Sequence, residues 1–206
     1  MNALILVDLQ YDFLPGGALA VHGGEEVIPI AGALQPMFDL VVATQDCHPA
    51  DHLSFASQHP GRSVGDLIDL SGLPQVLWPD HCVAGTRGAE LSQSLDRHKI
   101  DQVFPKGTDR EIDSYSGFFD NGQKRSTGLG EYLTSQNVDH VYVLGLATDY
   151  CVKATVFDAR RLGFTTTLIA DACRGVGLSP TDIDDAIEAM RSAGAFVTDS
   201  HSPFAR

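Results

Sequence analysis

The stretch 141-VYVLGLATDYCVKATVFDARRLG-163 joins a short apolar run directly to a helical pattern. The run at positions 140–146 is typical of a strand buried on both faces, and Gly163 ends the following pattern as a C-cap glycine does. Cys151 stands in the first turn of the expected helix. A strand that passes straight into a helix is one part of a βαβ unit, so this stretch predicts a parallel sheet.

The same alternation continues along the chain. Further strands are predicted at residues 3–7, 40–44, 102–106, 165–170 and 195–199, and helices at 25–38, 88–98, 126–136 and 179–195. The last helix is expected to begin with Ser179 as N-cap and Pro180 at its first position, whereas residues 45–87 are expected to be rich in loops. Right-handed crossovers then give an α/β fold with a doubly wound, mostly parallel sheet and helices on both faces, in a single domain over residues 1–206.

Composition favours one globular domain. The chain has 206 residues, of which 43% are hydrophobic, and its net charge of -13 would repel phosphate groups. The N-terminal apolar run stops at Asp8 without the basic residues of a signal peptide, and the four cysteines form no C-x-x-C pair. We therefore expect a cytoplasmic protein with free thiols that acts on a small molecule, without a nucleic acid or membrane partner. The sequence leaves open whether the protein forms a homo-oligomer.

Side chains suited to catalysis follow four of the predicted strands. Asp8, Lys106 and Cys151 stand at or just after strand ends, and the sequence QDCH follows another strand at positions 45–48. In doubly wound folds, ligands bind beyond the carboxyl ends of the strands. We therefore expect a carboxylate, an ammonium, a thiol and a possible metal site to meet at one rim of the sheet.

Cys151, Asp8 and Lys106 together predict covalent catalysis. The N–H groups at a helix N-terminus stabilise a thiolate, which is the nucleophile in cysteine enzymes. Asp8 can accept the thiol proton and pass it to a leaving group, and Lys106 favours both anions. Singly, the three have ordinary explanations as a small junction residue, a turn cap and a surface lysine. Their placement at three strand ends favours a Cys–Asp–Lys triad.

A metal site is predicted in the loop after the second strand. Residues two apart in an extended segment face the same side, so Asp46 and His48 can offer an oxygen and a nitrogen to one ion. His81, in WPDHC, supplies a second imidazole, and such a set leaves coordination positions open for water or substrate. The ion would be divalent, with zinc preferred and iron or manganese as alternatives. The competing interpretation is a polar loop whose histidines bond to backbone.

Four neighbouring residues are weaker candidates for binding the metal ion. His52, with Ser54, is either an additional ligand or a group that acts through a metal-bound water. Cys47 and Cys82 each adjoin a predicted ligand, but alternation along the chain turns their side chains away from the adjacent histidine. One carboxylate and two imidazoles therefore remain the predicted ligand set.

Six motifs spread over nearly the whole chain carry a resemblance to a known family. They are LILVDLQYDFLPGGALAV at 4–21, QDCHPADHLSFASQHP at 45–60, LWPDHCVAGTRGAEL at 77–91, FPKGTDREIDSYSGFFDN at 104–121, GLATDYCVKATVFDA at 145–159 and DACRGV at 171–176. With these motifs the chain resembles the isochorismatase-like cysteine hydrolases, and among them the bacterial nicotinamidase/pyrazinamidases. The metal-site and pocket motifs separate nicotinamidases from most of this superfamily.

The resemblance implies a role for each matching residue. Cys151, Asp8 and Lys106 would be the nucleophile, the proton shuttle and the cation of the triad. The resemblance implies the same three metal ligands that the spacing predicts. It also implies that the metal ion coordinates the ring nitrogen of the substrate. The implied substrate-binding residues are Phe13, Trp78, Tyr115 and Ala147.

The resemblance also implies a cis peptide bond between Ala147 and Thr148. The amides of Thr148 and Cys151 would then form the oxyanion hole, which stabilises the charge that develops on the amide oxygen. The implied reaction converts nicotinamide to nicotinate and ammonia through a cysteine thioester, in NAD salvage. Pyrazinamide should be hydrolysed as well.

Two other functions stay open on the sequence. A different cysteine amidase of the superfamily would act on a carbamoyl or ureido substrate, although those relatives generally lack the full set of metal-binding residues. A thiol redox or metal-binding protein on the same fold would oxidise Cys151 and hydrolyse no amide. The absence of a second cysteine close to Cys151 in sequence counts against that reading.

Overall fold

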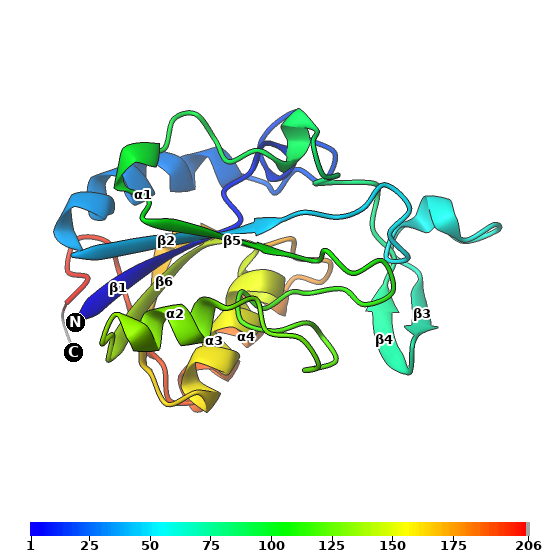
Figure 1. The fold of residues 1–206 in the computed structure, drawn as a ribbon. Coiled ribbons are helices and arrows are strands. Elements are labelled where there is room, and N and C mark those ends of the chain that lie inside the picture. The colour runs from blue at the N-terminus through cyan, green and yellow to red at the C-terminus, as the bar shows by residue number, and fades with distance from the viewer. Residues whose placement is uncertain (205–206) are drawn as a thin grey trace.

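The computed structural model describes residues 1–204, and its centre is one parallel sheet of six strands (Figure 1). In chain order the strands are β1 (Asn2–Val7), β2 (Leu40–Asp46), β5 (Gln102–Lys106), β6 (His140–Leu146), β7 (Thr165–Arg174) and β8 (Phe196–Thr198). They lie in the order β5-β2-β1-β6-β7-β8 and every neighbouring pair is parallel. All residues of β6 are buried, as its continuous apolar sequence predicts.

Helices cover both faces of the sheet. Helix α1 (Val27–Leu34) lies on one face, above the sheet in Figure 1, and α2 (Leu129–Ser135), α3 (Lys153–Arg161) and α4 (Asp182–Ser192) lie on the other. Helices α2 and α4 bury apolar side chains, Leu129 and Leu133 in α2 and Ala186 and Met190 in α4, and their exposed residues are polar. The predicted doubly wound α/β fold is confirmed.

A β-hairpin lies within residues 45–87, the region that the sequence predicts to be rich in loops. Its strands are β3 (Leu67–Leu70) and β4 (Leu73–Val76), and the turn residues Ser71 and Gly72 have φ angles of 55° and 84°. Two consecutive residues with positive φ are what a tight hairpin turn requires. Because each strand has only four residues, the flanking pattern is too short to reveal the hairpin from sequence.

The helix predicted at residues 88–98 is wrong. That segment contains only short 3₁₀ turns at Arg87–Ala89 and Arg97–Lys99. Leu91 and Leu95 are buried with helical spacing, but the backbone bonds elsewhere: the Ser92 N–H donates to the Leu9 carbonyl at 2.8 Å. The segment packs along the loop that follows β1, so a tertiary contact replaces the intrahelical hydrogen bonds.

Helix α4 begins later than its sequence suggests. Thr181 is its N-cap and Asp182 its first residue, whereas Ser179 and Pro180 lie before the helix. The Ser179 N–H donates to the Asp182 carboxylate at 2.7 Å, so the acidic side chain closes a turn ahead of the helix.

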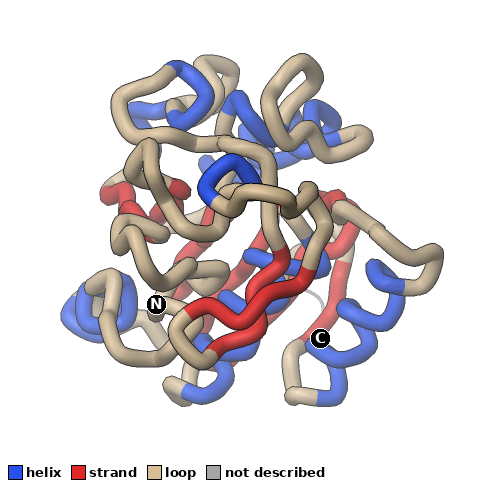
Figure 2. The backbone as a smooth tube through the Cα atoms, turned by 90° about the vertical axis from the view of Figure 1, so that its right-hand side faces the viewer, coloured by secondary structure: helices blue, strands red, loops and turns tan. Residues whose placement is uncertain are grey.

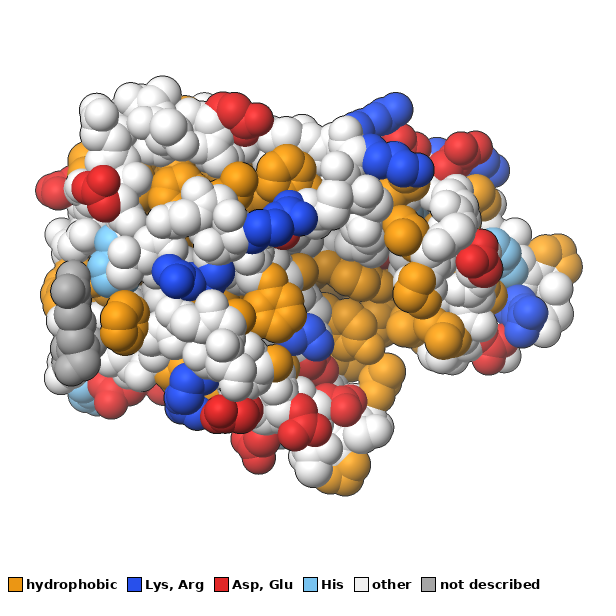
Figure 3. All heavy atoms as spheres, turned by 90° about the horizontal axis from the view of Figure 1, so that it is seen from below, with side chains coloured by type: hydrophobic (Ala, Val, Ile, Leu, Met, Phe, Trp, Pro, Cys, Tyr) orange, Lys and Arg blue, Asp and Glu red, His pale blue; other side chains and the backbone are white. Residues whose placement is uncertain are grey.

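Loops and the β3–β4 hairpin extend beyond the carboxyl ends of the parallel strands, and they cover that end of the molecule (Figure 2). Seen from below, the surface is hollowed beside the part that carries the hairpin, and hydrophobic side chains line the hollow (Figure 3). Within residues 1–204, no helix combines the length and the apolar character that crossing a membrane requires.

Candidate active site

Four parallel strands bring a thiol, an ammonium and two carboxylates to one point. Asp8 follows β1, and strand register places Asp46 of β2 directly beside Lys106 of β5. Cys151 lies in the turn after β6. The Lys106 ammonium is 2.9 Å from Asp8 Oδ2 and 2.6 Å from Asp46 Oδ1. It also donates to Cys151 Sγ at 3.4 Å and to the Ser114 carbonyl at 2.8 Å. The residues of the predicted triad therefore meet, and Lys106 joins them to a predicted metal ligand.

Lys106 carries its charge in the interior of the protein. Burial alone would lower its pKa, but the carboxylates of Asp46 and Asp8 outweigh that effect and hold the pKa well above its usual range. For Asp46, burial opposes ionisation in the same way, yet Lys106 and His48 hold its pKa well below the usual range. Each charge is therefore stabilised by its neighbours, and the loss of one member would leave the others buried without compensation.

Its surroundings make the Cys151 thiol a weaker acid than a free cysteine. Burial raises the pKa of the thiol well above its usual range, and the opposing effect of Lys106 is smaller. The sequence predicted a thiolate stabilised by a helix N-terminus, and the π-helical turn at 148–152 does precede α3, but the cost of burying the anion is larger. Cys151 therefore requires a base. Burial also raises the pKa of Asp8, which makes Asp8 a better proton acceptor than an exposed aspartate.

The cis peptide bond lies one residue earlier than expected. It joins Leu146 to Ala147, not Ala147 to Thr148. The Ala147 carbonyl accepts hydrogen bonds from the N–H groups of Tyr150 and Val152, so Ala147 already belongs to the helical turn and the change of chain direction precedes it. The N–H groups of Tyr150 and Val152 therefore already have a hydrogen-bond acceptor. The N–H groups that are predicted to form the oxyanion hole belong to two other residues of the same turn, Thr148 and Cys151.

Asp46, His48 and His81 converge as the sequence predicts. Asp46 Oδ2 lies 3.4 Å from His48 Nε2 and 3.7 Å from His81 Nε2. The two Nδ1 atoms each lie 2.8 Å from a backbone carbonyl, those of Gly107 and Pro79. A carbonyl only accepts, so both Nδ1 atoms carry hydrogen and both Nε2 atoms face Asp46.

The chemistry of this cluster fits a divalent metal ion. His48 Nε2 is buried and has no hydrogen-bond partner. Burial alone would lower the pKa of His48, but the Asp46 carboxylate raises it to about 9, so a proton and a metal ion would compete for Nε2. One carboxylate and two imidazole nitrogens with fixed tautomers are a suitable donor set for zinc, iron or manganese.

His52 and Ser54 lie beside this cluster in a different relation to it. The backbone N–H of Ser54 donates to His52 Nδ1 at 3.1 Å, and the Ser54 hydroxyl lies 2.7 Å from the same atom. Burial and the neighbouring His48 lower the pKa of His52, so the ring is neutral and its proton is on Nε2. That N–H is buried without a partner and can donate to a bound water.

The neighbouring cysteines are not part of the cluster. The Cys82 thiol is buried and directed to the Gly88 carbonyl at 4.0 Å, and Cys47 is half-buried. Neither belongs to a group of side chains in residues 1–204 whose ligand atoms converge. Strand alternation likewise predicts that the two cysteines are weaker candidates for metal ligands than Asp46, His48 and His81.

Gly107 sets the position of His48. Its φ is +64°, and a Cβ at this residue would overlap the imidazole of His48, lying 2.7 Å from Nδ1. We expect Gly107→Ala to displace the ring and to weaken divalent metal affinity by about 10–100-fold, the usual effect of disturbing the partner of a metal-binding histidine. Competition with a chromogenic chelator measures this affinity. Gly65→Ala is the matched control, because its φ of +91° is similar and its Cβ would meet nothing within 4 Å. Equal metal affinity in both variants would contradict the expectation.

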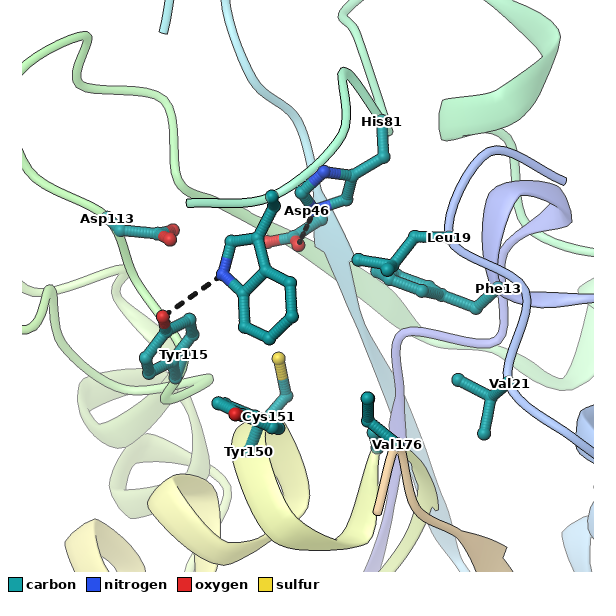
Figure 4. A pocket seen from close by; sticks show the side chains of 12 residues that line it. Phe13, Leu19, Val21, Asp46, His81, Asp113, Tyr115, Tyr150, Cys151 and Val176 are labelled. Carbon is teal, nitrogen blue, oxygen red and sulfur yellow. Dashed lines mark hydrogen bonds and ion pairs between the residues drawn. The ribbon is translucent and has the colours of Figure 1, made fainter. Parts of the chain in front are cut away.

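A pocket opens onto the catalytic cluster (Figure 4). The sulfur of Cys151 points into it, Asp46 and His81 lie at the opposite side, and Phe13 flanks it. The predicted substrate-binding residues Phe13, Trp78, Tyr115 and Ala147 all line it. The Trp78 indole N–H and the Gln75 amide both donate to the Tyr115 hydroxyl at 3.1 Å, which fixes the two aromatic rings against each other.

Several pocket residues escaped the sequence analysis. They are Leu19, Val21, Asp113, Tyr150 and Val176. All five stood inside motifs already singled out, but no local pattern showed that these side chains would line one pocket.

Comparisons with known proteins match the chain over nearly its whole length. A family model described as the isochorismatase domain matches residues 2–202. The chain is 48% identical, over 198 residues, to the nicotinamidase of Escherichia coli K12, which covers 94% of this chain and 92% of that protein.

Solved structures with the same fold include enzymes with ligands. The nicotinamidase/pyrazinamidase of Acinetobacter baumanii superposes with a TM-score of 0.94 and 41% identity, covering 98% of this chain and 97% of that one. The yeast nicotinamidase bound to the inhibitor nicotinaldehyde gives 0.90 and 33%, covering 97% and 100%. The pyrazinamidase of Pyrococcus horikoshii in complex with zinc gives 0.78 and 36%, covering 96% and 98%.

Proposed function

The chain belongs to the isochorismatase family, and from this we propose that it is a nicotinamidase, which hydrolyses nicotinamide to nicotinate and ammonia through a thioester on Cys151. One observation carries the proposal. The thiol, its base and the metal-binding cluster face the same small, aromatic-lined pocket. Pyrazinamide has the same shape and carboxamide, so it is a second substrate.

The first half of the reaction forms the thioester. Asp8 takes the proton from Cys151 Sγ, and the sulfur attacks the carboxamide carbon. The charge that develops on the amide oxygen is stabilised by the amides of Thr148 and Cys151. Asp8 then returns its proton to the amide nitrogen, the C–N bond breaks and ammonia leaves.

The second half hydrolyses the thioester. Asp8, again ionised, takes a proton from a water molecule as its oxygen attacks the thioester carbon. As the C–S bond breaks, Asp8 gives that proton to the Cys151 sulfur, and nicotinic acid loses its remaining acid proton to solvent and leaves as nicotinate. Lys106 keeps its proton throughout, because two carboxylates hold it, and it stabilises the anions on either side. The walls of Phe13 and Trp78 keep other water away from the sulfur.

Asp46, His48 and His81 would hold one divalent metal ion, and zinc is the first choice. When bound, the ion supplies a Lewis-acid site for the ring nitrogen of the pyridine, which orients the carboxamide towards Cys151. His52 would serve through its Nε2–H as a donor to water at this site, with Ser54 fixing its tautomer.

Removing the metal should abolish turnover without inactivating the thiol. Prolonged dialysis against a strong chelator is expected to reduce ammonia release from nicotinamide at least about 100-fold, because the substrate loses its orientation. Alkylation of Cys151 by iodoacetamide should continue. Reloading with zinc, iron(II) or manganese in separate samples then identifies the ions that restore activity. Full activity in protein shown to be metal-free would contradict the role of the cluster.

The direct test is ammonia release from nicotinamide by reduced, metal-loaded protein, with pyrazinamide and a panel of carbamoyl and ureido amides alongside. We expect the two aromatic amides to be hydrolysed and the aliphatic ones to be poor substrates. Preference for a ureido amide would favour the alternative amidase, and oxidation of Cys151 with no amide turnover would favour a redox protein. We place the reaction in the cytoplasm, as a step of NAD salvage.

A further inference from the structure

We propose that Thr44 is a positioning residue of the proton shuttle: its hydroxyl fixes the Asp8 carboxylate so that Oδ2, and not Oδ1, exchanges the proton with Cys151. This inference rests on the proposed amide hydrolysis through Cys151. Thr44 does not touch the pocket and belongs to none of the motifs that predicted the site.

The Thr44 hydroxyl holds Asp8 at two points. It donates to Asp8 Oδ1 at 2.6 Å, the short distance typical of a hydroxyl bonded to an ionised carboxylate, and it accepts from the Asp8 backbone N–H at 3.2 Å. Both residues are completely buried. One hydroxyl group therefore fixes the backbone and the side chain of the same aspartate.

Asp8 has a conformation that requires such a restraint. Its φ is +49°, in the left-handed region that non-glycine residues adopt at an energetic cost. Sheet register explains why Thr44 supplies the restraint: Leu6 of β1 lies beside Ala43 of β2, so the next residue of β2 adjoins the end of β1. The parallel pairing itself thus delivers the hydroxyl to Asp8.

The restraint leaves the two oxygens of Asp8 in different states. Oδ1 is occupied by the Thr44 hydroxyl. Oδ2 forms an ion pair with Lys106 at 2.9 Å but accepts no well-aligned hydrogen bond, so it keeps a lone pair free inside the catalytic cluster. In the acylation step the proton passes from Cys151 Sγ to Oδ2 and then to the departing nitrogen, while the Oδ1 hydrogen bond stays unchanged.

Thr44→Val is the test, because it removes the hydroxyl and keeps the shape. We expect kcat for nicotinamide to fall by about 10–100-fold, a large part of what a positioned base contributes, with KM within about twofold of the wild type. Alkylation of Cys151 by iodoacetamide, followed by mass spectrometry of its peptide, should slow by about 10-fold. Thr44→Ser should restore both rates to within about threefold, because it returns the hydroxyl.

Thr166→Val is the matched control. Thr166 is also completely buried in the same sheet, and its hydroxyl donates to the Phe164 carbonyl at 3.0 Å, at the end of β7 away from the site. This variant should keep the wild-type kcat and alkylation rate. If Thr44→Val does not fold, Thr44→Ala and Thr44→Ser replace it, since these two differ from each other only in the hydroxyl.

Two results would overturn the assignment. One is wild-type kcat and alkylation in folded Thr44→Val. The other is a Thr44→Ser protein as slow as Thr44→Val, which would assign the effect to the methyl group that packs near Gly117. If the wild type releases no ammonia from nicotinamide, the proposed function fails, and the alkylation rates still decide whether Thr44 positions the base.

Discussion

Cys151→Ala protein should release no measurable ammonia from nicotinamide, a loss of at least about 10⁴-fold in kcat. The substitution removes the atom that forms the thioester, and no second cysteine, serine or threonine of residues 1–204 lines the pocket beside it. Nicotinamide should still bind, because the aromatic walls and the metal ligands are unchanged. Ammonia release in a coupled assay measures the first effect, and equilibrium dialysis with labelled nicotinamide measures the second.

Cys173→Ala is the control for this result. Cys173 is also buried, and burial raises the pKa of its thiol to about 12, but it lies in β7 and does not line the pocket. The variant should keep most of the activity. If Cys151→Ala hydrolysed nicotinamide at a rate near that of the wild type, covalent catalysis by this residue would be excluded.

Lys106→Met should cause the largest loss of stability. Methionine replaces the side-chain stem but removes the charge, which leaves Asp8 and Asp46 buried without their shared cation. Breaking a buried ion pair from one side typically lowers the free energy of unfolding by about 3–5 kcal/mol. Urea unfolding followed by circular dichroism measures the change, and folded Lys106→Met should be inactive.

Lys99→Met provides the comparison for stability. The Lys99 side chain is 45% exposed and lies 3.8 Å from Asp96, so solvent screens the pair and its removal should change stability little. A Lys106→Met protein as stable as Lys99→Met would show that the two carboxylates need no cation, for instance because one is protonated. That result would remove Lys106 from the triad.

The site was largely predictable because it lies at strand ends. A parallel strand buried on both faces is easy to recognise, and the fold dictates that its carboxyl end borders the ligand site. Asp8, Asp46, Lys106 and Cys151 could therefore be placed together without knowledge of any distance. His81 was less constrained, since it lies in a loop and only its residue type pointed to the metal.

The remaining features depend on tertiary contacts. Residues 88–98 have a helical pattern of leucines, yet the segment bonds to the loop after β1. The raised pKa of the Cys151 thiol depends on burial, which a local sequence does not specify. Thr44 looks like an ordinary strand residue, and only the register of β1 with β2 reveals its contact with Asp8.

The strand order also determines when the chain can become active during folding. β1 lies between β2 and β6, and its pairing with β6 joins segments that are far apart in the sequence, such as Asn2 and His140. Pairings between distant segments form slowly, because closing the long loop between them costs conformational entropy before the stabilising contacts can form. A nascent chain that has assembled only β1, β2 and β5 would hold the two carboxylates and the ammonium, but no nucleophile. Recovery of activity after dilution from denaturant should therefore coincide with completion of the sheet, and no partly folded species should contribute to it.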